Sequence, residues 1–515
     1  MSEIANFGEF FAPASTDMID GLVAQYDSAK KKCEGIADIF SGDANSYLRY
    51  FFEGNGDKHA QYGFNNRLFE LDGAVKALNS AYWSKALAMT DVLDCMPQKR
   101  RDEWHKSISD KTAPDFVDAT VRATLNELLN QRSKFLAERV DGIFRGLSGE
   151  HVTNKSVGFS KRMIVGYVLS SYGSPEYSAS GRINDLRAVI AKFMGRGELG
   201  YNESYGLIES LKKSWGKWVT IDGGALKIRL YKKGTAHIEV HPDMAWRLNQ
   251  ILAYLYPLAI PAQHRTRPAK KLKEFEMMQK PIGFAVLKML RDAKPYRDCD
   301  QKSVHIRNNE NKAASIEVAN ILRALGGVEI KSGSFQFDYE ISPIIDEVCL
   351  TGGIPDQRSH QYYPTPENVA QDAVELAEIE AHHDCLEPSA GQGGLADYMP
   401  KSTKCCEISK LHCDILTAKG FEVLQGDFLA MASQLGKFDR IVMNPPYSEG
   451  RWQAHTIAAS KLLKSDGVLV SVLPASAPNS FSIAGFSIEW SRTYANEFTG
   501  TSVSVAIAKI KKEKL

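Results

Sequence analysis

The chain has 515 residues, which is too long for a single hydrophobic core, so we expect two to four domains. It is 43% hydrophobic and 24% charged, as in ordinary globular proteins, and the absence of a long apolar run excludes a membrane-spanning class. Residues 1–11 are acidic and lack the basic start of a signal peptide. Because the eight cysteines have no regular spacing, we expect a reduced, cytoplasmic protein.

The small net charge of +1 is unevenly distributed along the chain. Residues 351–515 hold 15 Lys and Arg against 19 Asp and Glu, a net charge of −4, so residues 1–350 carry +5. If a polyanion binds, the N-terminal portion should supply more of the electrostatic attraction. Random scatter would also explain so small a difference.

Residues 16–147 show mostly helical patterns. The clearest predicted helix covers 114–147, because Pro114 suits a first helical turn and Gly149 follows the end. Its apolar stripe consists of Val121, Leu125, Leu128, Leu136, Val140, Ile143 and Leu147. Its other face carries Arg122, Arg132, Lys134, Arg139 and Arg145. We interpret these cations as solvated charge rather than as a nucleic-acid surface.

A polar segment, 151–162, comes next. Its donor-rich side chains suit phosphates or base edges, and they equally suit ordinary helix caps, so both interpretations stay open. Strand patterns then occupy 218–221, 226–230 and 236–240, and the glycine-containing turns between them predict hairpins. A helix is expected over 242–256.

Residues 261–280 are the best candidate for a linker, since they combine many cations with few apolar side chains. A basic linker can lie along a phosphate backbone, although solvation alone would explain its composition. The candidate nucleic-acid-binding residues of this linker and of the polar segment are Asn154, Lys155, Lys161, Arg162, Arg265, Arg267, Lys270 and Lys271.

Residues 281–350 predict a small α+β domain. Helices are expected near 283–290 and 315–325, and a hairpin is expected from strands at 328–330 and 334–339. Helix, helix and hairpin is the order of a winged-helix DNA-binding domain. The same order is common in other small domains, so the pattern does not assign a function.

From residue 351 onwards, strands alternate with helices, and short turns follow the strands. Strands are expected before Glu387, Glu407, Asp427 and Asn444, and later ones over 468–473 and 500–507. This order predicts a doubly wound α/β domain. In such sheets ligands bind at the carboxyl ends of the strands, where the four polar side chains lie.

The turn 387–394 has the glycines needed for a tight turn and for close approach of a ligand to the backbone. It lacks the final glycine of the dinucleotide fingerprint, and the acid that opens it suits a cationic amino group rather than a pyrophosphate. At the next strand end, Glu407 can bind ribose hydroxyls. After the third strand, Asp427 can accept a hydrogen bond from an adenine amine, and Phe428 can pack on the adenine ring.

The segment Asn444-Pro445-Pro446-Tyr447 follows an apolar strand and forms a stiff turn, because each proline fixes φ and removes an N–H donor. An exocyclic amine on a base is a weak nucleophile, since its lone pair is delocalised into the ring. Two acceptors, the Asn444 side-chain oxygen and the Pro445 carbonyl, would favour a pyramidal nitrogen with an available lone pair. Tyr447 can stack on a base that has left its helix. A surface turn is the simpler interpretation.

Four cysteines of this region, with two neighbouring histidines, also resemble a set of metal ligands. They are Cys385, Cys405, Cys406, Cys413, His382 and His383. Their spacing fits no zinc pattern, and cysteine is common in buried strands, so we predict packing and no metal.

Several motifs of 361–511, and the order in which they occur, resemble those of S-adenosylmethionine-dependent DNA adenine-N6 methyltransferases of gamma motif order. The matching segments are Tyr363-Pro364-Thr365-Pro366, Glu387-Pro388-Ser389-Ala390-Gly391, Glu407, Gly426-Asp427-Phe428, Asn444-Pro445-Pro446-Tyr447 and Phe498-Thr499-Gly500-Thr501-Ser502-Val503. The resemblance implies a Rossmann-like class I methyltransferase domain, S-adenosylmethionine as cofactor and DNA as partner. The implied catalytic residues are Asn444, Pro445, Pro446 and Tyr447. The implied cofactor-binding residues are Tyr363, Thr365, Glu387, Ser389, Gly391, Gly393, Glu407, Asp427, Phe428 and Asn444.

The first 350 residues resemble an uncharacterised domain that accompanies such methylases in phages and plasmids, and this match implies no function for that domain. A role of the protein in shielding mobile DNA from restriction is a hypothesis that rests on the resemblance alone. We therefore expect a helical and α+β domain over 1–260 that is a candidate for DNA binding, a basic linker over 261–280, a small α+β domain over 281–350 and a methyltransferase domain over 351–515. Gamma-order methylases usually carry a recognition domain after the last catalytic strand, and here the sequence ends at Leu515. We therefore expect a short or relaxed recognition sequence.

Two other functions stay open. The same chemistry on RNA adenine or guanine, on cytosine N4 of DNA or on a protein glutamine would fit the Asn-Pro-Pro-Tyr segment. A DNA-binding protein whose methylase fold only senses the cofactor is the non-enzymatic alternative, and the intact Asn444 and Glu387 argue against it.

Overall fold

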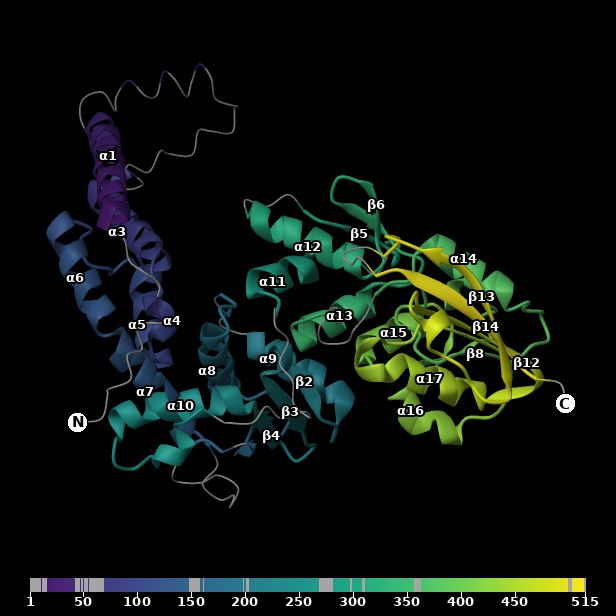
Figure 1. The fold of residues 1–515 in the computed structure, drawn as a ribbon. Helices are drawn as coiled ribbons and strands as arrows, with labels where there is room; N and C mark the ends of the chain where they lie inside the picture. Colours follow the sequence, from purple (N-terminus) through teal and green to yellow (C-terminus); the bar gives the residue numbers. More distant parts are fainter. Residues whose placement is uncertain are drawn as a thin grey trace. The chain divides into compact units, whose positions relative to one another are not determined.

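The computed structural model describes residues 11, 16–41, 47, 50, 54, 69–147, 158–160, 162–197, 199–200, 203–267, 281–296, 299–307, 311–355, 363–498 and 503–513. The chain divides into two compact units, Met1–Glu276 and Met277–Leu515, each of which is described by itself. The boundary falls within the range 261–280, where the sequence suggests a linker. Figure 1 shows the elements of both units.

The first unit combines helices with one small sheet. Its helices are α1 Thr16–Ser41, α3 Leu71–Ala88, α4 Val92–Cys95, α5 Gln98–Ser109, α6 Asp118–Asn130, α7 Arg132–Arg145, α8 Tyr177–Phe193, α9 Glu203–Leu211 and α10 Pro242–Leu255. Its strands are β1 Arg162–Val165, β2 Val219–Ile221, β3 Leu226–Leu230 and β4 Ala236–Val240, in the antiparallel order β1-β4-β3-β2. The three predicted strands and the helix after them are confirmed. The strand β1 was not predicted.

The single helix predicted over 114–147 is wrong, because the structure has two helices there. The segment before Asp118 stays extended, since the Phe116 N–H donates to Asn79 Oδ1 and the Pro114 carbonyl accepts from Trp83 Nε1. Gln131, with φ −86° and ψ −2°, forms a turn between the end of α6 at Asn130 and the start of α7 at Arg132. Tertiary hydrogen bonds and one local turn therefore override a continuous apolar stripe.

Arg139 was also expected on a solvated face, and that expectation is wrong. Its side chain is 1% exposed and donates to Asp185 Oδ1 from Nε at 2.9 Å and from Nη2 at 2.6 Å. Arg139 also donates to the Asp94 carbonyl. The helix α8, which carries Asp185, packs against α7 and covers this face, so the arginine becomes an internal ion-pair partner.

The second unit begins with a small α+β part. Its elements are α11 Phe284–Asp292, β5 Ser303–His305, α12 Lys312–Ala324, β6 Val328–Lys331, β7 Ser334–Gln336 and α13 Ser342–Thr351. The predicted helices and hairpin are confirmed, and β5 joins them to make a three-stranded sheet in the order β5-β7-β6. This part is attached to the larger sheet domain by Gln392, whose Nε2 donates to the Ala324 carbonyl at 2.9 Å, and by an ion pair between Lys410 and Glu347.

A seven-stranded sheet forms the rest of the second unit. Its strands are β8 Cys385–Glu387, β9 Lys404–Glu407, β10 Glu422–Gln425, β11 Phe438–Met443, β12 Leu463–Pro474, β13 Phe486–Tyr494 and β14 Val505–Lys512. Their order is β10-β9-β8-β11-β12-β14-β13, with parallel pairing up to β12 and antiparallel pairing of β14 to both neighbours. This confirms the predicted doubly wound, Rossmann-like α/β fold.

Helices cover both faces of this sheet. One face holds α14 Glu367–Leu376, whose Val369, Ala370 and Ala373 pack with buried side chains of β11 and β12. The other face holds α16 Phe428–Met431 and α17 Arg451–Ser460, in a second cluster that includes Phe428 and Trp452. Burial of apolar side chains on both faces fixes the strands and therefore the position of their carboxyl ends.

Near the end of the chain the predictions were incomplete. The last strand was expected over 500–507, whereas β14 covers Val505–Lys512, and residues 499–502 lie outside the described part. The strand β13 was not predicted, although Phe486, Ile488 and Trp490 alternate with more exposed polar residues in the pattern of an edge strand. Among the described residues no helix is long and apolar enough to cross a bilayer.

We predict that Arg139→Met lowers the free energy of unfolding of the first unit by about 3 kcal/mol, because Asp185, whose side chain is only 13% exposed, keeps just the longer ion pair with Arg101 at 3.4 Å. The matched control is Lys134→Met on the same helix, at a side chain that is 59% exposed, with an expected change within about 0.5 kcal/mol. Urea unfolding of the full chain, followed by its helical circular dichroism signal, measures both. Equal stabilities of the two variants would contradict a structural role of the ion pair.

Candidate active site

The carboxyl ends of the parallel strands bring the predicted residues together. Glu387 ends β8, Glu407 ends β9, Asp427 follows β10 and Asn444 follows β11. They line one cavity of about 560 Å³. The predicted site residues that line this cavity are Tyr363, Thr365, Glu387, Ser389, Gly391, Glu407, Asp427, Phe428, Asn444, Pro445, Pro446 and Tyr447. Gly393 is not among the lining residues, so the structure gives it a different place.

The glycine turn takes its shape from two left-handed residues. Gly391 has φ 55° and Gly393 has φ 92°, a region that side chains other than glycine adopt at a cost. The Gly391 N–H donates to Glu407 Oε2 at 2.8 Å, which connects the turn after β8 to the tip of β9. A Cβ on Gly393 would lie 3.2 Å from Leu416 Cδ2, so this glycine allows packing beneath the turn.

Glu387 is a buried acid without a partner on one of its oxygens. The residue is 2% exposed, and Oε2 has no hydrogen-bond partner among the described residues. Burial raises the pKa of this carboxyl well above its usual range, and the nearby acids Asp397 and Glu407 raise it further. A cavity wall with an unsatisfied carboxyl suits a ligand that brings a hydrogen-bond donor or a positive charge.

Glu407 is held in place by backbone donors. Its Oε1 accepts from the Ser409 N–H at 2.7 Å, and its Oε2 accepts from Gly391. The His412 ring lies 3.8 Å from Oε1 and is itself buried. Each carboxylate oxygen still has a second lone pair, so this fixed side chain can also accept bonds from hydroxyl groups in the cavity.

Asp427 and Phe428 form another side of the cavity. Partial burial alone would raise the pKa of Asp427, but hydrogen bonds from Arg451 and from the Leu429 amide lower it below its usual value. Phe428 is 2% exposed and presents an apolar wall. A charged acceptor next to a flat apolar wall suits a heterocycle that carries an amino group.

The corner at Asn444 is held by two neighbouring hydroxyls. Asn444 Nδ2 donates to Thr365 Oγ1 at 3.1 Å, and the Tyr447 hydroxyl is 3.0 Å from Asn444 Oδ1. That hydroxyl is also 3.2 Å from the Val472 carbonyl, and the Tyr447 ring packs against both core clusters. In this structure Tyr447 therefore orients Asn444, whereas the sequence suggested that it stacks on a base.

Sequence reasoning missed His455 and Arg451 of α17, which also line the cavity. His455 Nδ1 lies 3.1 Å from Ser389 Oγ, its Nε2 has no partner among the described residues, and its ring centroid is 5.5 Å from that of Phe428. Burial lowers the pKa of this histidine to about 4, helped by the charge of Arg451. The only sequence signal was a histidine little more than one turn into the helix after the proline corner.

Three of the eight candidate nucleic-acid-binding residues are described, and all three belong to the first unit. Asn154, Lys155, Lys161, Lys270 and Lys271 lie outside the described residues, so the structure gives them no place. Arg162 starts β1, and its Nε donates to Glu239 Oε1 at 2.9 Å. Arg265 and Arg267 follow the short 3-10 helix Ala262–His264 of the first unit.

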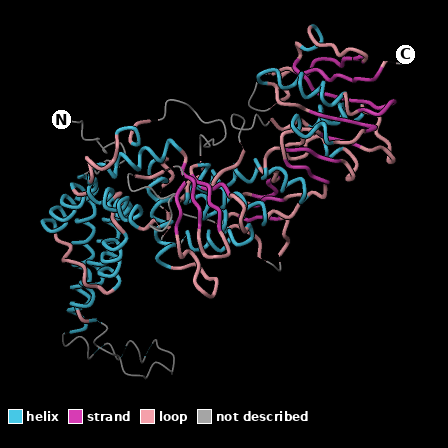
Figure 2. The backbone as a smooth tube through the Cα atoms, turned by 90° about the horizontal axis from the view of Figure 1, so that it is seen from below, coloured by secondary structure: helices cyan, strands magenta, loops and turns pink. Residues whose placement is uncertain are grey.

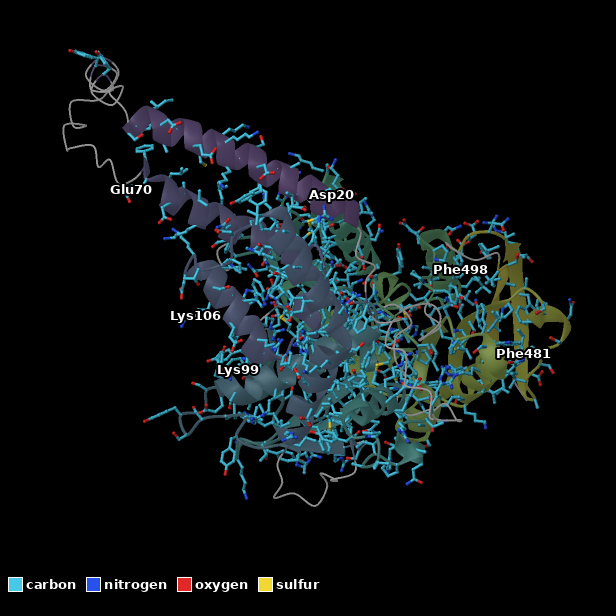
Figure 3. The ribbon with its side chains drawn as sticks, turned by 90° about the vertical axis from the view of Figure 1, so that its left-hand side faces the viewer. Asp20, Glu70, Lys99, Lys106, Phe481 and Phe498 are labelled. Carbon is cyan, nitrogen blue, oxygen red and sulfur yellow. The ribbon has the colours of Figure 1, made fainter. Side chains whose placement is uncertain are left out.

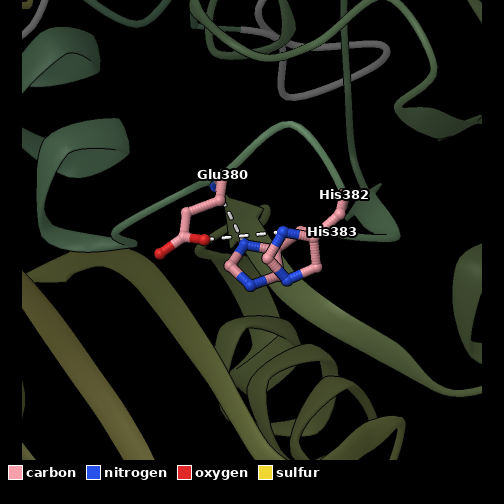
Figure 4. A group of neighbouring side chains, drawn as sticks. All are labelled: Glu380, His382 and His383. Atoms are coloured by element: carbon pink, nitrogen blue, oxygen red, sulfur yellow. Dashed lines mark hydrogen bonds and ion pairs between the residues drawn. The ribbon is translucent and has the colours of Figure 1, made fainter.

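The cysteines considered as metal ligands lie inside the fold. Burial raises the pKa of the Cys385 thiol to about 11 and that of the Cys413 thiol to about 12. A separate group, Glu380, His382 and His383, has ligand atoms within 4.8 Å of one another (Figure 4). His383 Nδ1 already accepts from the Glu380 N–H at 2.9 Å, and the Glu380 and His382 side chains are 69% and 74% exposed. This exposed turn is not a built metal site.

Comparison with known proteins finds a family model that matches part of the first unit. Residues 75–258 match a model described as a domain of unknown function (DUF4942), which covers less than half of the chain. No curated protein matches the chain.

Three solved structures illustrate the fold-level matches. A presumed RNA methyltransferase from Pyrococcus horikoshii is 21% identical, with 31% of this chain and 92% of the other covered and a TM-score of 0.27. The precorrin-6y C5,15-methyltransferase of Geobacter metallireducens is 16% identical, covering 28% and 87%, with a TM-score of 0.24. An rRNA methylase from Streptococcus thermophilus is 8% identical, covering 29% and 98%, with a TM-score of 0.23. These values are too low to bear on what the chain does.

We predict a pH dependence of stability that originates at His455. Its pKa is about 4 in the folded chain, below the ordinary 6.5, so unfolding takes up a proton below pH 6.5. Its contribution to stability is complete above pH 6.5 and is lost as the pH falls towards 4. The melting temperature of His455→Gln should therefore decline less between pH 7 and pH 5 than that of the parent chain.

The matched control for this prediction is His382→Gln in the same unit, at a side chain that is 74% exposed. Differential scanning calorimetry at both pH values measures the three proteins. The interpretation of His455 is wrong if His455→Gln and the parent chain lose the same number of degrees.

Proposed function

We propose that the second unit transfers a methyl group from S-adenosylmethionine to an exocyclic amino group of a nucleic-acid base. The observation that carries this proposal is that a single cavity joins the Asn444–Tyr447 corner to the glycine turn and the acids at the ends of β8, β9 and β10. A ligand bound at the acids and a base amine held at the corner would therefore share one space. When bound, S-adenosylmethionine supplies a methyl group that its sulfonium already activates.

The residues of the cavity fit this cofactor. Glu387 offers an unsatisfied buried carboxyl to the cationic amino group, and the tight glycine turn lets the ligand approach the backbone. Glu407 is fixed by two amides and can accept from ribose hydroxyls. Asp427 and Phe428 offer an acceptor and an apolar wall to the adenine.

The chain's contribution to the reaction is orientation and hydrogen bonding at the amine. Asn444 Oδ1 and the Pro445 carbonyl accept from its two N–H groups, which favours the pyramidal form with a free lone pair. Thr365 and Tyr447 hold the Asn444 amide in one orientation. A fixed acceptor pair lowers the barrier because little reorganisation is needed when the transition state forms.

Among substrates we favour N6 of adenine in DNA, and the support for this choice is the ordered set of sequence motifs, above all the segment Tyr363–Pro366. Amines of RNA bases, cytosine N4 and protein glutamine would meet the same corner, so these stay as alternatives. A cofactor-sensing DNA-binding protein is the non-enzymatic alternative. A role in shielding DNA from restriction rests on the sequence resemblance alone, and it requires that the modified DNA resist cleavage.

We predict that the full chain, incubated with labelled S-adenosylmethionine and duplex DNA, produces N6-methyladenine. Nucleoside digestion followed by mass spectrometry identifies the product, with single-stranded DNA, RNA and glutamine-containing peptides as parallel substrates. If a different methylated product formed, the proposed substrate, adenine in DNA, would be wrong, and the product would identify the true substrate. Cofactor binding without methyl transfer to any of these substrates would instead favour the sensor.

We predict that Asn444→Ala lowers methyl transfer about a hundredfold or more, because it removes one of the two acceptors for the amine. The control is Asn479→Ala, at an exposed asparagine of the same unit, which should retain parent activity. Single-turnover rates at saturating cofactor separate the two variants, and calorimetric cofactor binding shows whether the cavity is intact. Near-normal turnover of Asn444→Ala would refute the role of this residue.

A further inference from the structure

The small sheet of the first unit has one apolar face and one mainly polar face, on which Ile164 of β1, opposite His237, is a buried apolar exception. Pairing places Met163, Ile238 and Ile228 side by side on one face, and all three are buried. This face packs on α8, since Met163, Ile238 and the α8 residue Ile183 border one small internal void. Figure 2, a view from below, draws the strands of this sheet in magenta in front of cyan helices of the first unit.

The opposite face is rich in cations. The strand register places Lys227 opposite Glu239, and Glu239 opposite Arg162, in one row across β3, β4 and β1. In the next row Arg229 of β3 lies opposite His237 of β4. We call Arg162, Lys227 and Arg229 the basic face. Glu239, which pairs with Arg162, is the single acid in these rows, so the face keeps an excess of positive charge.

Flat side chains lie among these cations. The Arg162 guanidinium lies 5.3 Å from the centroid of the Trp218 ring, and the Arg229 guanidinium lies 5.1 Å from that of Tyr231. The Tyr231 ring is also 4.6 Å from the ring of His237. Rings and guanidinium planes are the groups on which unpaired bases stack.

One end of the sheet adds exposed tyrosines and lysines. The turn between β3 and β4 carries Lys232 and Lys233, both exposed. Beside this turn the Val168 N–H donates to the Gly234 carbonyl at 2.7 Å, which fixes the neighbouring loop against it. Tyr167 and Tyr172 of that loop are 78% and 95% exposed. We call Tyr167, Tyr172, Lys232 and Lys233 the tyrosine tip.

Tyr167 is held in a conformation that a bulky residue rarely adopts. Its φ is +52°, in the left-handed region, where a side chain with a Cβ is strained. The ring contacts little of the protein, because most of it is exposed, so ring packing does not offset the strain. Strained residues of this kind cluster at functional sites, where a partner makes use of their geometry.

We propose that the basic face and the tyrosine tip together bind a single-stranded stretch of nucleic acid. The cations complement phosphates, and the exposed rings offer stacking surfaces to bases, which a duplex keeps hidden in its own stack. This inference deepens the proposed function, on which it rests for the class of substrate, because it assigns a nucleic-acid-binding surface to the domain of unknown function. DNA and RNA single strands share this chemistry.

The test measures binding of the full chain to a fluorescent 20-nucleotide single-stranded DNA, the same RNA and the corresponding duplex, by anisotropy over a range of salt concentrations. The parent chain should bind the single strands more tightly than the duplex, and the comparison of the two strands identifies the preferred sugar. Replacing Lys232 and Lys233 together by alanine should lower the slope of log affinity against log salt by about 1.4, at about 0.7 per lost phosphate contact. The control replaces Lys99 and Lys106 of α5 by alanine (Figure 3) and should leave the slope unchanged.

A second variant, Tyr167→Gly, separates binding from folding. Glycine tolerates positive φ, so the melting temperature should rise, while affinity should fall about tenfold through loss of a stacking surface. Tyr254→Ala, at a 44% exposed tyrosine of α10, is the control and should leave affinity unchanged. A purely structural role of Tyr167 would change stability and leave affinity as it was.

These binding measurements test the proposed nucleic-acid-binding surface without depending on methyl transfer. Unchanged affinity in both the lysine and the tyrosine variants, or tighter binding of the duplex than of either strand, would overturn the inference. Weaker binding in these variants, with the Lys99 and Lys106 control and the Tyr254 control binding like the parent chain, would support it. If the parent chain transferred no methyl group but bound single strands through these residues, the proposed function would fail and the surface would stand.

Discussion

The hydrogen bond between the Gly391 N–H and Glu407 Oε2 is the interaction on which the arrangement of the cavity depends. It joins the turn after the first strand of the parallel sheet to the tip of the second, and it uses a carboxylate that the Ser409 amide also fixes. The neighbouring Glu387 is left with an unsatisfied oxygen in the same wall. Glu407 is therefore oriented by backbone amides and keeps a second lone pair on each oxygen for a ligand, whereas Glu387 has one oxygen with no partner among the described residues.

The proline corner is also held rigidly. Two prolines fix the backbone, and hydroxyls from Thr365 and Tyr447 fix the Asn444 amide. A site whose acceptors are already oriented needs little reorganisation when a ligand enters. Because the Tyr447 ring is packed into both core clusters, its orientation depends on the same apolar burial that holds the sheet together.

In the first unit, side chains alternate between the two faces of the small sheet. Its four-stranded sheet buries one set of side chains on α8 and presents cations and rings on the other face. The attached loop places Tyr167 in a strained conformation with its ring in solvent. The strained backbone of Tyr167 is not offset by packing of its ring, and this distinguishes the surface from an ordinary polar face of a sheet.

The sequence by itself determined the order of the parallel strands in the second unit and the residues at their ends, because apolar runs and the turns after them are local signals. From this order it also predicted that Glu387, Glu407, Asp427 and Asn444 meet at one edge. Only the tertiary structure decided which partners they have. His455 reaches the cavity because α17 packs across the sheet, Arg139 is internal because α8 covers it, and Tyr447 turns its hydroxyl towards Asn444. The first two contacts join residues far apart in the chain or depend on how a helix is rotated, and the third depends on how the Tyr447 ring packs in the core. Periodicity records only that a residue is polar or apolar.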